Sequence, residues 1–294
     1  MHIEQTAKAF TLIEIVTSIV IVSIISAGMC LFISLPIKAH HDAVKYTNYS
    51  AMGDIAMQRM KQELKNAVPN SVRVKPNNNL ALEFMPTVEY IHYRSDTPGN
   101  HKDILIFTAE DNKFATLTRF KIVNKHSHNY ILTIANKGTF TINSDNPTAG
   151  ENLYNPNPSG NTHVIINNIN NMNNTHGHTI GHVVLPHQHQ FSFESPTNKA
   201  YFVKYPMSFI CDLNAKTLTL YYNYSTTAVQ PTDPTISPLV DGQSALLATN
   251  IQGCFFDYKP ATAATDGVVT TTLSLGDGTN NFSLMQQVRL TNEE

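Results

Sequence analysis

The sequence predicts an α+β protein in which a long N-terminal helix is joined to a large antiparallel β-rich head. Three observations lead to this fold class. Residues 15–37 contain no charged side chain and are mostly Ile, Val, Leu, Met or Phe. Apolar residues then recur at three- and four-residue spacing to about residue 66, which is typical of a helix. Beyond residue 70 the spacing shifts towards two, which is typical of strands.

The composition narrows the class of protein. Charged residues make up 14% of the 294-residue chain, against roughly 25% in ordinary soluble domains, and the formal net charge is −2. A nucleic-acid-binding protein would carry a strong basic excess, so nucleic acid is not an expected partner. Three cysteines are too few for a disulfide-dense scaffold. The profile is typical of a β-rich, loop-heavy protein outside the cytoplasm.

The charge-free run 15–37 is long enough to cross a membrane. As a helix it is about 35 Å long, compared with about 30 Å for the hydrocarbon core of a bilayer. A signal peptide would have a shorter apolar region and a small-residue cleavage site after it, and neither is present. Glu14 lies between apolar residues at the start of the run. A carboxylate in lipid is costly without a partner, so Glu14 is a candidate functional residue.

The residues around Glu14 carry a family resemblance. The segment Ala9-Phe10-Thr11-Leu12-Ile13-Glu14 and the apolar run after it resemble the class III signal of type IV pilins and type II secretion pseudopilins. The resemblance implies that a prepilin peptidase cleaves between Ala9 and Phe10 on the cytoplasmic side and that the new amino group of Phe10 is methylated. It also implies that Glu14 pairs with the N-terminal amine of a neighbouring subunit during assembly. The chain departs from the family in having Ala9 where glycine is usual, and its leader is only weakly basic.

The pilin plan implies four segments and a set of partners. The segments are a cleaved leader (1–9), a transmembrane helix (10–37), an amphipathic continuation of that helix (38–68) and a β-rich head (69–294). Pro36 is expected to bend the helix or to remove one hydrogen bond. The implied location is the bacterial inner membrane, with the head in the periplasm, and afterwards a surface pilus. The implied partners are the prepilin peptidase, the major pilin, other minor pilins and the inner-membrane assembly platform.

The continuation of the helix carries an apolar stripe that is expected to form the spine of the head's core. Its members are Ala43, Val44, Met52, Ile55, Ala56, Met57, Met60, Leu64 and Ala67.

The head is expected to contain many short strands. Long loops are expected at 143–162, between the strands at 164–166 and 179–185, and at 226–243, the last of them exposed. GDGTNN at 276–281 predicts a hairpin turn. Calcium binding is the alternative, although a single Asp supplies few of the oxygen ligands that calcium needs. The predicted strands are 71–74, 80–86, 88–93, 104–109, 114–122, 130–134, 138–142, 164–166, 179–185, 190–193, 200–204, 208–211, 217–222, 251–258, 267–275 and 282–290.

Cys211 and Cys254 are predicted to form a disulfide. Both fall in the head, which the N-in orientation places in an oxidising compartment, and each follows a short apolar run. Closing a loop of about 43 residues would contribute about 4 kcal/mol in the chain-entropy description. Two free thiols are the alternative. Cys30 lies in the apolar helix and is interpreted as a buried thiol or a palmitoylation bystander.

Histidine-rich segments raise the question of a metal site. His-x-His pairs can chelate from one face of a strand. No Cys, Asp or Glu joins them at ligand spacing, so solvated loop histidines are the preferred interpretation, and neither metal nor cofactor is expected. Motifs for catalysis such as G-x-S-x-G, H-E-x-x-H and Walker A are absent, which indicates a non-enzyme. The histidines concerned are His126, His128, His176, His178, His182, His187 and His189.

Several patches of the head sharpen the resemblance. Residues 59–74, 195–196, 205–212, 251–258 and 284–290 resemble the minor pilins of the mannose-sensitive haemagglutinin (MSHA) pilus biogenesis family, which are similar to J-type pseudopilins. The resemblance implies a minor subunit that helps to initiate or prime pilus assembly. Two alternatives stay open: a J-type pseudopilin of type II secretion, and a tip adhesin or binding module that uses the loops of 143–190.

Overall fold

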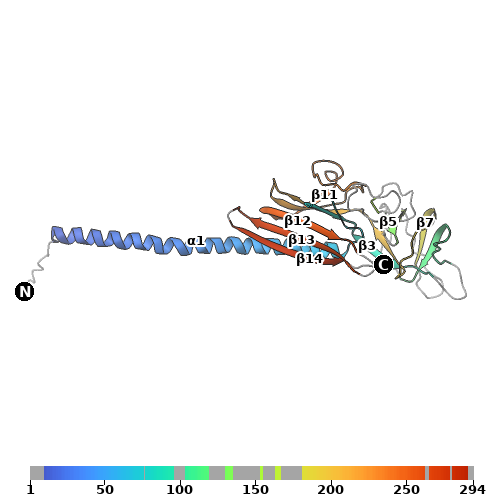
Figure 1. Cartoon of the computed structure of the whole chain (residues 1–294), viewed down its shortest axis with the longest axis horizontal. Coiled ribbons are helices and arrows are strands. Elements are labelled where there is room, and N and C mark those ends of the chain that lie inside the picture. The colour runs from blue at the N-terminus through green and yellow to red at the C-terminus, as the bar shows by residue number, and fades with distance from the viewer. Residues whose placement is uncertain are drawn as a thin grey trace, which may run out of the picture. The chain divides into compact units, whose positions relative to one another are not determined.

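The computed structural model describes residues 10–75, 77–95, 103–118, 130–134, 153–154, 163–166, 181–261, 265–278 and 280–290. Within these residues it contains one helix and fourteen strands (Figure 1). The chain falls into two compact units, Met1–Ala51 and Met52–Glu294. Every pairing between strands is antiparallel. The predicted α+β class is therefore confirmed.

Helix α1 spans Leu12–Lys65 without a break and passes through both units. Pro36 lies inside it and does not end it, although proline has no N–H to donate to the preceding turn. The helix closes with a tighter turn, in which the N–H groups of Asn66 and Ala67 donate to carbonyl oxygens three residues earlier, at 3.0 Å each. Its end lies within one residue of the predicted position.

The part of α1 in the second unit buries one stripe of small and apolar residues. Gly53, Ala56, Met57, Met60 and Leu64 are buried, and their spacing of three or four residues places them on one side of the helix. A Cβ atom at Gly53 would come within 2.5 Å of Leu284 Cδ1, so the helix backbone approaches the β-region closely at this point.

The predicted stripe was partly wrong. Met52 and Ala67 are half-buried, but Ala43, Val44 and Ile55 are exposed, Ile55 to 66%. Each residue advances about 100° around a helix, so Ile55 points well away from its buried neighbour Ala56.

A five-stranded sheet forms the centre of the head, in the order β1-β2-β9-β10-β11. All four side chains of β2 are buried, as are the central ones of β9, so both faces of the sheet are covered at these two strands. The edge strand β11 was missed, because its sequence QSALLAT has no β-branched residue except its last. The strands are β1 (Arg73–Val74), β2 (Ala81–Phe84), β9 (Met207–Asp212), β10 (Thr217–Tyr222) and β11 (Gln243–Thr249).

A three-stranded sheet follows, formed by β12 (Ile251–Lys259), β13 (Gly267–Gly276) and β14 (Asn281–Leu290). Burial alternates along β13, so one face is packed and the other lies open. The predicted hairpin turn joins β13 to β14. Asp277 Oδ1 accepts the N–H of Asn280 at 2.9 Å, and Gly278 has a φ of 95°, which glycine adopts without strain.

A third group of strands surrounds a separate apolar cluster. A four-stranded sheet has the order β3-β8-β5-β6, and β4 pairs with β7. Ile91, Phe114, Leu132, Val183 and Phe202 from five of these strands are buried in one cluster. The strands are β3 (Thr87–His92), β4 (Asp111–Thr116), β5 (Tyr130–Thr133), β6 (His163–Ile166), β7 (Gly181–His189) and β8 (Lys199–Val203).

Several strand predictions in this region were wrong. Residues 104–109 and 190–193 are irregular, although Leu105 and Phe191 are buried in the cluster. The strand predicted at 114–122 begins at Asp111 and ends at Thr116. The strand predicted at 138–142 and most of the loop 143–162 lie outside the described residues.

Candidate functional site

The N-terminal segment of the described chain begins just before the helix. Phe10 is exposed and precedes α1, and the carbonyl oxygen of Thr11 accepts the N–H groups of Glu14 at 3.0 Å and Ile15 at 3.2 Å. Glu14 therefore lies in the first turn, where the helix dipole favours a carboxylate. Phe10 and Glu14 are thus about one helical turn apart, whereas Ala9 lies outside the described residues.

The helix surface after Glu14 is apolar on all sides. Residues Leu12–Met29 form a stretch long and apolar enough to span a membrane, and none of it is buried in the protein. Three hydroxyl groups in this stretch bond to the helix itself: Thr17 and Ser18 donate to Glu14 O at 3.1 and 2.7 Å, and Ser23 donates to Ile19 O at 2.7 Å. These polar atoms therefore need no water, as a helix in lipid requires.

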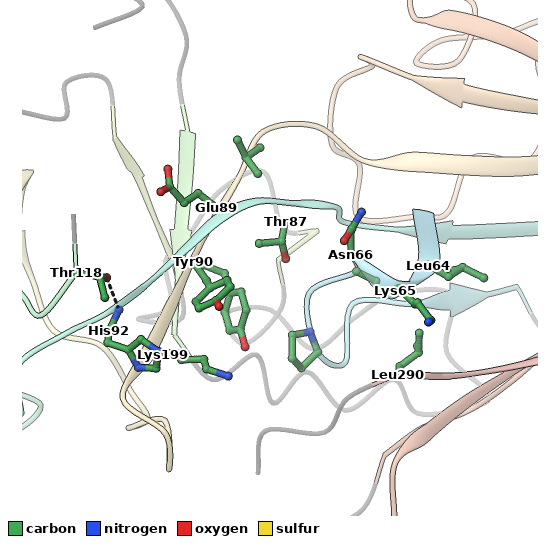
Figure 2. Close-up of a pocket in the computed structure, with 14 residues that line it drawn as sticks. Leu64, Lys65, Asn66, Thr87, Glu89, Tyr90, His92, Thr118, Lys199 and Leu290 are labelled. Atoms are coloured by element: carbon green, nitrogen blue, oxygen red, sulfur yellow. Dashed lines mark hydrogen bonds between the residues drawn. The ribbon is translucent and has the colours of Figure 1, made fainter. Parts of the chain in front are cut away.

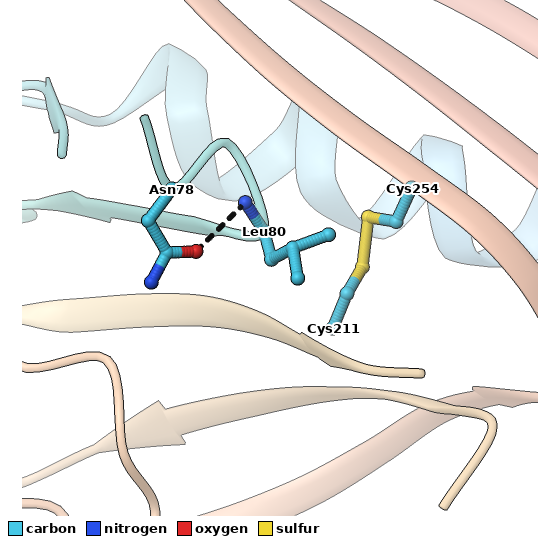
Figure 3. The surroundings of a disulfide bond; sticks show 4 residues. All are labelled: Asn78, Leu80, Cys211 and Cys254. Carbon is cyan, nitrogen blue, oxygen red and sulfur yellow. Dashed lines mark hydrogen bonds between the residues drawn. A yellow bond between two sulfur atoms is a disulfide. The ribbon is translucent and has the colours of Figure 1, made fainter. Parts of the chain in front are cut away.

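The structure brings together the two cysteines that the sequence analysis pairs. Cys211 on β9 and Cys254 on β12 form a disulfide with an S–S distance of 1.96 Å and a Cα–Cα distance of 6.4 Å (Figure 3). Asn79 lies near the same junction, where its carbonyl oxygen accepts Phe256 N–H and its Nδ2 donates to Phe256 O, both at 2.8 Å. The disulfide and these two hydrogen bonds therefore help to join the five-stranded sheet region to β12.

A buried ion pair lies in the five-stranded sheet. Arg73 on β1 lies directly opposite Glu83 on β2, and Arg73 Nε donates to Glu83 Oε2 at 2.6 Å. Glu83 is fully buried, and its other oxygen accepts the hydroxyl of Tyr224 at 2.9 Å. That hydroxyl also lies 2.6 Å from Ser208 Oγ. Burial raises the pKa of Glu83, while the charge and hydrogen bond of Arg73 and the hydrogen bond from Tyr224 oppose the rise.

Arg73 uses its remaining nitrogens to hold a loop. Nη1 donates to Ala228 O at 2.6 Å and Nη2 to Thr227 O at 2.9 Å, while the guanidinium carbon lies 3.7 Å from the centre of the Tyr154 ring. The guanidinium therefore ties residues 227–228 to the sheet. Its partners are backbone, carboxylate and aromatic groups inside the protein, which gives the pair a structural role. Sequence reasoning missed it because the two charges are ten residues apart.

A groove of about 720 Å³ opens beside the C-terminal end of α1 (Figure 2). Its lining includes Lys65, Glu89, Tyr90, His92 and Lys199. Lys199 Nζ lies 5.5 Å from the centre of the Tyr90 ring, within the range of a cation–π interaction. This lining offers hydrogen bonding and an aromatic surface, but no arrangement of side chains that identifies a reaction.

The histidines of β7 are described, and they do not gather into a metal site. His182 Nε2 lies 3.3 Å from Asp103 Oδ2, and Lys113 Nζ lies 3.4 Å from Asp103 Oδ1. Desolvation raises the pKa of Asp103, but these two partners outweigh it and the net shift is downwards. Within the described part of the chain, no three His, Cys, Asp or Glu side chains are placed to hold a metal ion. The predicted His126, His128, His176 and His178 lie outside it.

The loops of 143–190, which one alternative assigns to binding, also lie largely outside the described residues. Comparison with protein-family profiles, with curated proteins and with solved structures finds no match to this chain.

Proposed function

We propose that the chain is a minor subunit of a type IV pilus of the MSHA type, which helps to initiate or prime pilus assembly. One observation carries the proposal. The segment Phe10–Glu14, which resembles the prepilin signal, stands at the start of a continuous helix. The 18 residues Leu12–Met29 of this helix are exposed, and they form a stretch long and apolar enough to span a membrane. A helix that is apolar all round needs a surrounding apolar phase, which lipid or the core of a filament supplies.

The architecture of the second unit supports the same function. The C-terminal turns of α1 bury one stripe, and antiparallel strands and a disulfide make up the rest of the described head. This arrangement supports the pilin plan that the sequence resemblance implies. The head also exceeds 200 residues, which would crowd a thin fibre if it were repeated in every position and so favours a minor subunit.

Glu14 has a specific role in this proposal. After cleavage between Ala9 and Phe10, the amine of Phe10 carries a positive charge one turn from Glu14. Within a bundle of such helices, Glu14 of one subunit pairs with the amine of the next. Two charges in a medium of low dielectric constant are costly apart and far less costly together. The pair therefore sets the register between subunits.

A complementation experiment tests the proposal. The gene is deleted in its own bacterium, and surface pili are counted by electron microscopy after the wild-type, Glu14→Ala or Asp54→Ala chain is restored. Asp54 is a matched control, because it is an exposed carboxylate on the same helix but lies beyond the apolar stretch. Pili should disappear on deletion and return with the wild type and with Asp54→Ala.

The Glu14→Ala chain should be inserted and cleaved normally but should fail to restore pili. Full restoration by Glu14→Ala would contradict the proposed role of the carboxylate. Normal pilus numbers after deletion, with a loss of protein secretion instead, would assign the chain to a type II secretion pseudopilus. Normal pilus numbers with a loss of attachment alone would favour a tip adhesin.

A further inference from the structure

Strand β14 has an open edge. It pairs with β13 in continuous register from Gly276↔Asn281 to Gly267↔Leu290, and in the described residues it pairs with no other strand. The side-chain hydrogen bonds of Ser283 and Gln287 also run back to β13, to Ser274 and Thr270. The second edge of β14 therefore carries a row of backbone groups without partners in the described structure.

The hydrogen bonds of β12 identify which residues face this edge. Phe256 uses its N–H and C=O to bond Asn79, away from β13. The N–H and C=O groups of successive residues point to opposite sides of a strand. Those of Phe255 therefore point towards β13, and those of its partner Thr272 point towards β12. By the same alternation, the N–H and C=O groups of Leu273 point towards β14 and pair with those of Leu284. The N–H and C=O groups of the odd-numbered residues of β14 then point outwards: Asn281, Ser283, Met285, Gln287 and Arg289.

Three other edge strands of the described head, β1, β3 and β11, are protected in ways that β14 is not. The edge strand β11 contains an irregularity in its pairing, and the N–H of Thr249 donates to Met52 Sδ at 3.2 Å. Strand β1 is two residues long, and β3 has a register shift near Val88. Natural sheets blunt open edges with bulges, charges, proline or short length. Strand β14 has ten residues, no proline, no register shift and a single charge at Arg289.

The outer face of this sheet is apolar at its centre. Phe255, Thr272 and Met285 are cross-strand neighbours on β12, β13 and β14, and Met285 is 69% exposed. The flanking rows contain serine, threonine and glutamine. An extended, uncharged backbone with an apolar residue opposite Met285 would complement both the edge and this face.

We infer that β14 is an interface for a second copy of this chain, with the two β14 strands antiparallel and a two-fold axis at Met285. In this register Met285 meets its own counterpart, Ser283 meets Gln287, and Asn281 meets Arg289. All outward N–H and C=O groups then find partners, whereas any shifted register leaves some unpaired. No two like charges face each other. The strand is thus self-complementary, as an isologous interface requires, and the two sheets join into one of six strands.

Cysteine cross-linking of the full chain in detergent tests this register. Cys30 is first replaced by serine, so that the disulfide-bonded Cys211 and Cys254 are the only native cysteines left. Met285→Cys should then give a covalent dimer with a cross-linker that spans neighbouring strands, about 5–6 Å. Ser283→Cys alone should not, because its two copies would be about 14 Å apart along the strands. A mixture of Ser283→Cys and Gln287→Cys chains should cross-link to each other.

A charge substitution gives a second, independent measurement. Met285→Lys places two like charges on the axis and should convert the dimer to a monomer in sedimentation velocity, with the thermal unfolding of the head unchanged, since the side chain is exposed in one copy. Phe255→Lys is the matched control, because it alters the same row two strands from the axis and should leave the dimer intact.

Three results would overturn the inference. The first is a wild-type chain that is monomeric at every concentration, and the second is a Met285→Lys chain that stays dimeric. The third is a Ser283→Cys chain that cross-links to itself as readily as the Met285→Cys chain does. None of these results bears on pilus assembly, so the two proposals fail separately.

Discussion

The two ends of α1 have similar apolar residues but use them in opposite ways. In Leu12–Met29 isoleucine, valine and leucine occupy every side of the helix, and all of them are exposed. From Met52 to Lys65 the apolar side chains are mostly confined to one stripe, which is buried, and Arg59, Lys61 and Lys65 occupy the remaining sides.

The difference shows that the placement of charged residues around a helix decides whether its apolar residues can be buried by the same chain. A single apolar stripe can be covered by the chain's own strands, as happens around Met60 and Leu64. A surface that is apolar all round cannot be covered by one small head, so its partner has to come from outside the chain. In the proposed function, lipid and other helices cover the exposed N-terminal surface, whereas the chain's own head covers the buried stripe.

The largest effect is expected when the same charge is placed at each end of α1 in turn. Ile21 and Ile55 are exposed isoleucines of α1, to 57% and 66%. Ile21→Asp should release the chain from membranes, because a carboxylate at the centre of a spanning helix costs about 2.5–3.5 kcal/mol. Ile55→Asp should leave the membrane-bound fraction unchanged. Alkaline extraction of membranes and flotation measure both, and equal behaviour of the two variants would refute the assignment.

The buried ion pair offers the largest expected effect on the head alone. Arg73→Met leaves the carboxylate of Glu83 buried without its partner and should lower the free energy of unfolding by about 3–5 kcal/mol. The double variant Arg73→Met/Glu83→Leu should be more stable than Arg73→Met, because both charges are gone. Denaturant unfolding of the full chain in detergent, followed through tyrosine circular dichroism, gives the values. Additive losses in the double variant would show that the pair is not coupled.

The two glycines of α1 differ in how closely other residues approach them. At Gly53 a Cβ would meet Leu284 at 2.5 Å and Leu275 at 3.2 Å, whereas at Gly28 nothing lies within 4 Å. Gly53→Val should therefore overpack the helix against the sheet and cost the head about 1–3 kcal/mol. Gly28→Val should not change the melting temperature of the head. A Gly53→Val chain as stable as wild type would show that the Leu284 side chain moves aside without penalty.

Asp103 should give the smallest effect, and it appears only in acid. Its pKa is lowered below the ordinary value of 3.8, so it contributes stability above that value and loses the contribution as the pH falls through the folded pKa. The side chain is 39% exposed, which keeps the expected difference below about 1 kcal/mol. Asp103→Asn should narrow the gap in stability between pH 6 and pH 3. An unchanged acid profile would show that His182 and Lys113 do not stabilise the carboxylate.

Periodicity predicted the features that depend on local sequence. The continuous helix, its end near Asn66 and the hairpin after β13 follow from apolar spacing, a proline beyond the helix and a Gly-Asp-Gly turn. Strand β11 could not be found in this way, because alanine and leucine within QSALLAT favour a helix as much as a strand. Residues 104–109 begin with a continuous apolar run that is typical of a strand, but they join no sheet. Leu105 is buried in the cluster around Phe114 and Phe202, and its N–H donates to Arg94 O at 2.9 Å.

The candidate sites divide along the same line. Phe10 and Glu14 are found from a contiguous motif, and Cys211 with Cys254 from the compartment that the motif implies. The pairing of Arg73 with Glu83 depends on the register of β1 with β2, and the free edge of β14 depends on which strands do not pair. Such features arise from contacts between distant parts of the chain, and no local sequence pattern predicts them.

In the proposed function, the exposed apolar helix is a retained assembly segment rather than a removed signal or a plain anchor. The most direct test is mass spectrometry of the N-terminal peptide of the membrane-bound chain, isolated from its own bacterium. The account predicts a chain that begins at N-methylated Phe10. A chain that begins at Met1, or one that has lost the helix by cleavage beyond Met29, would contradict it.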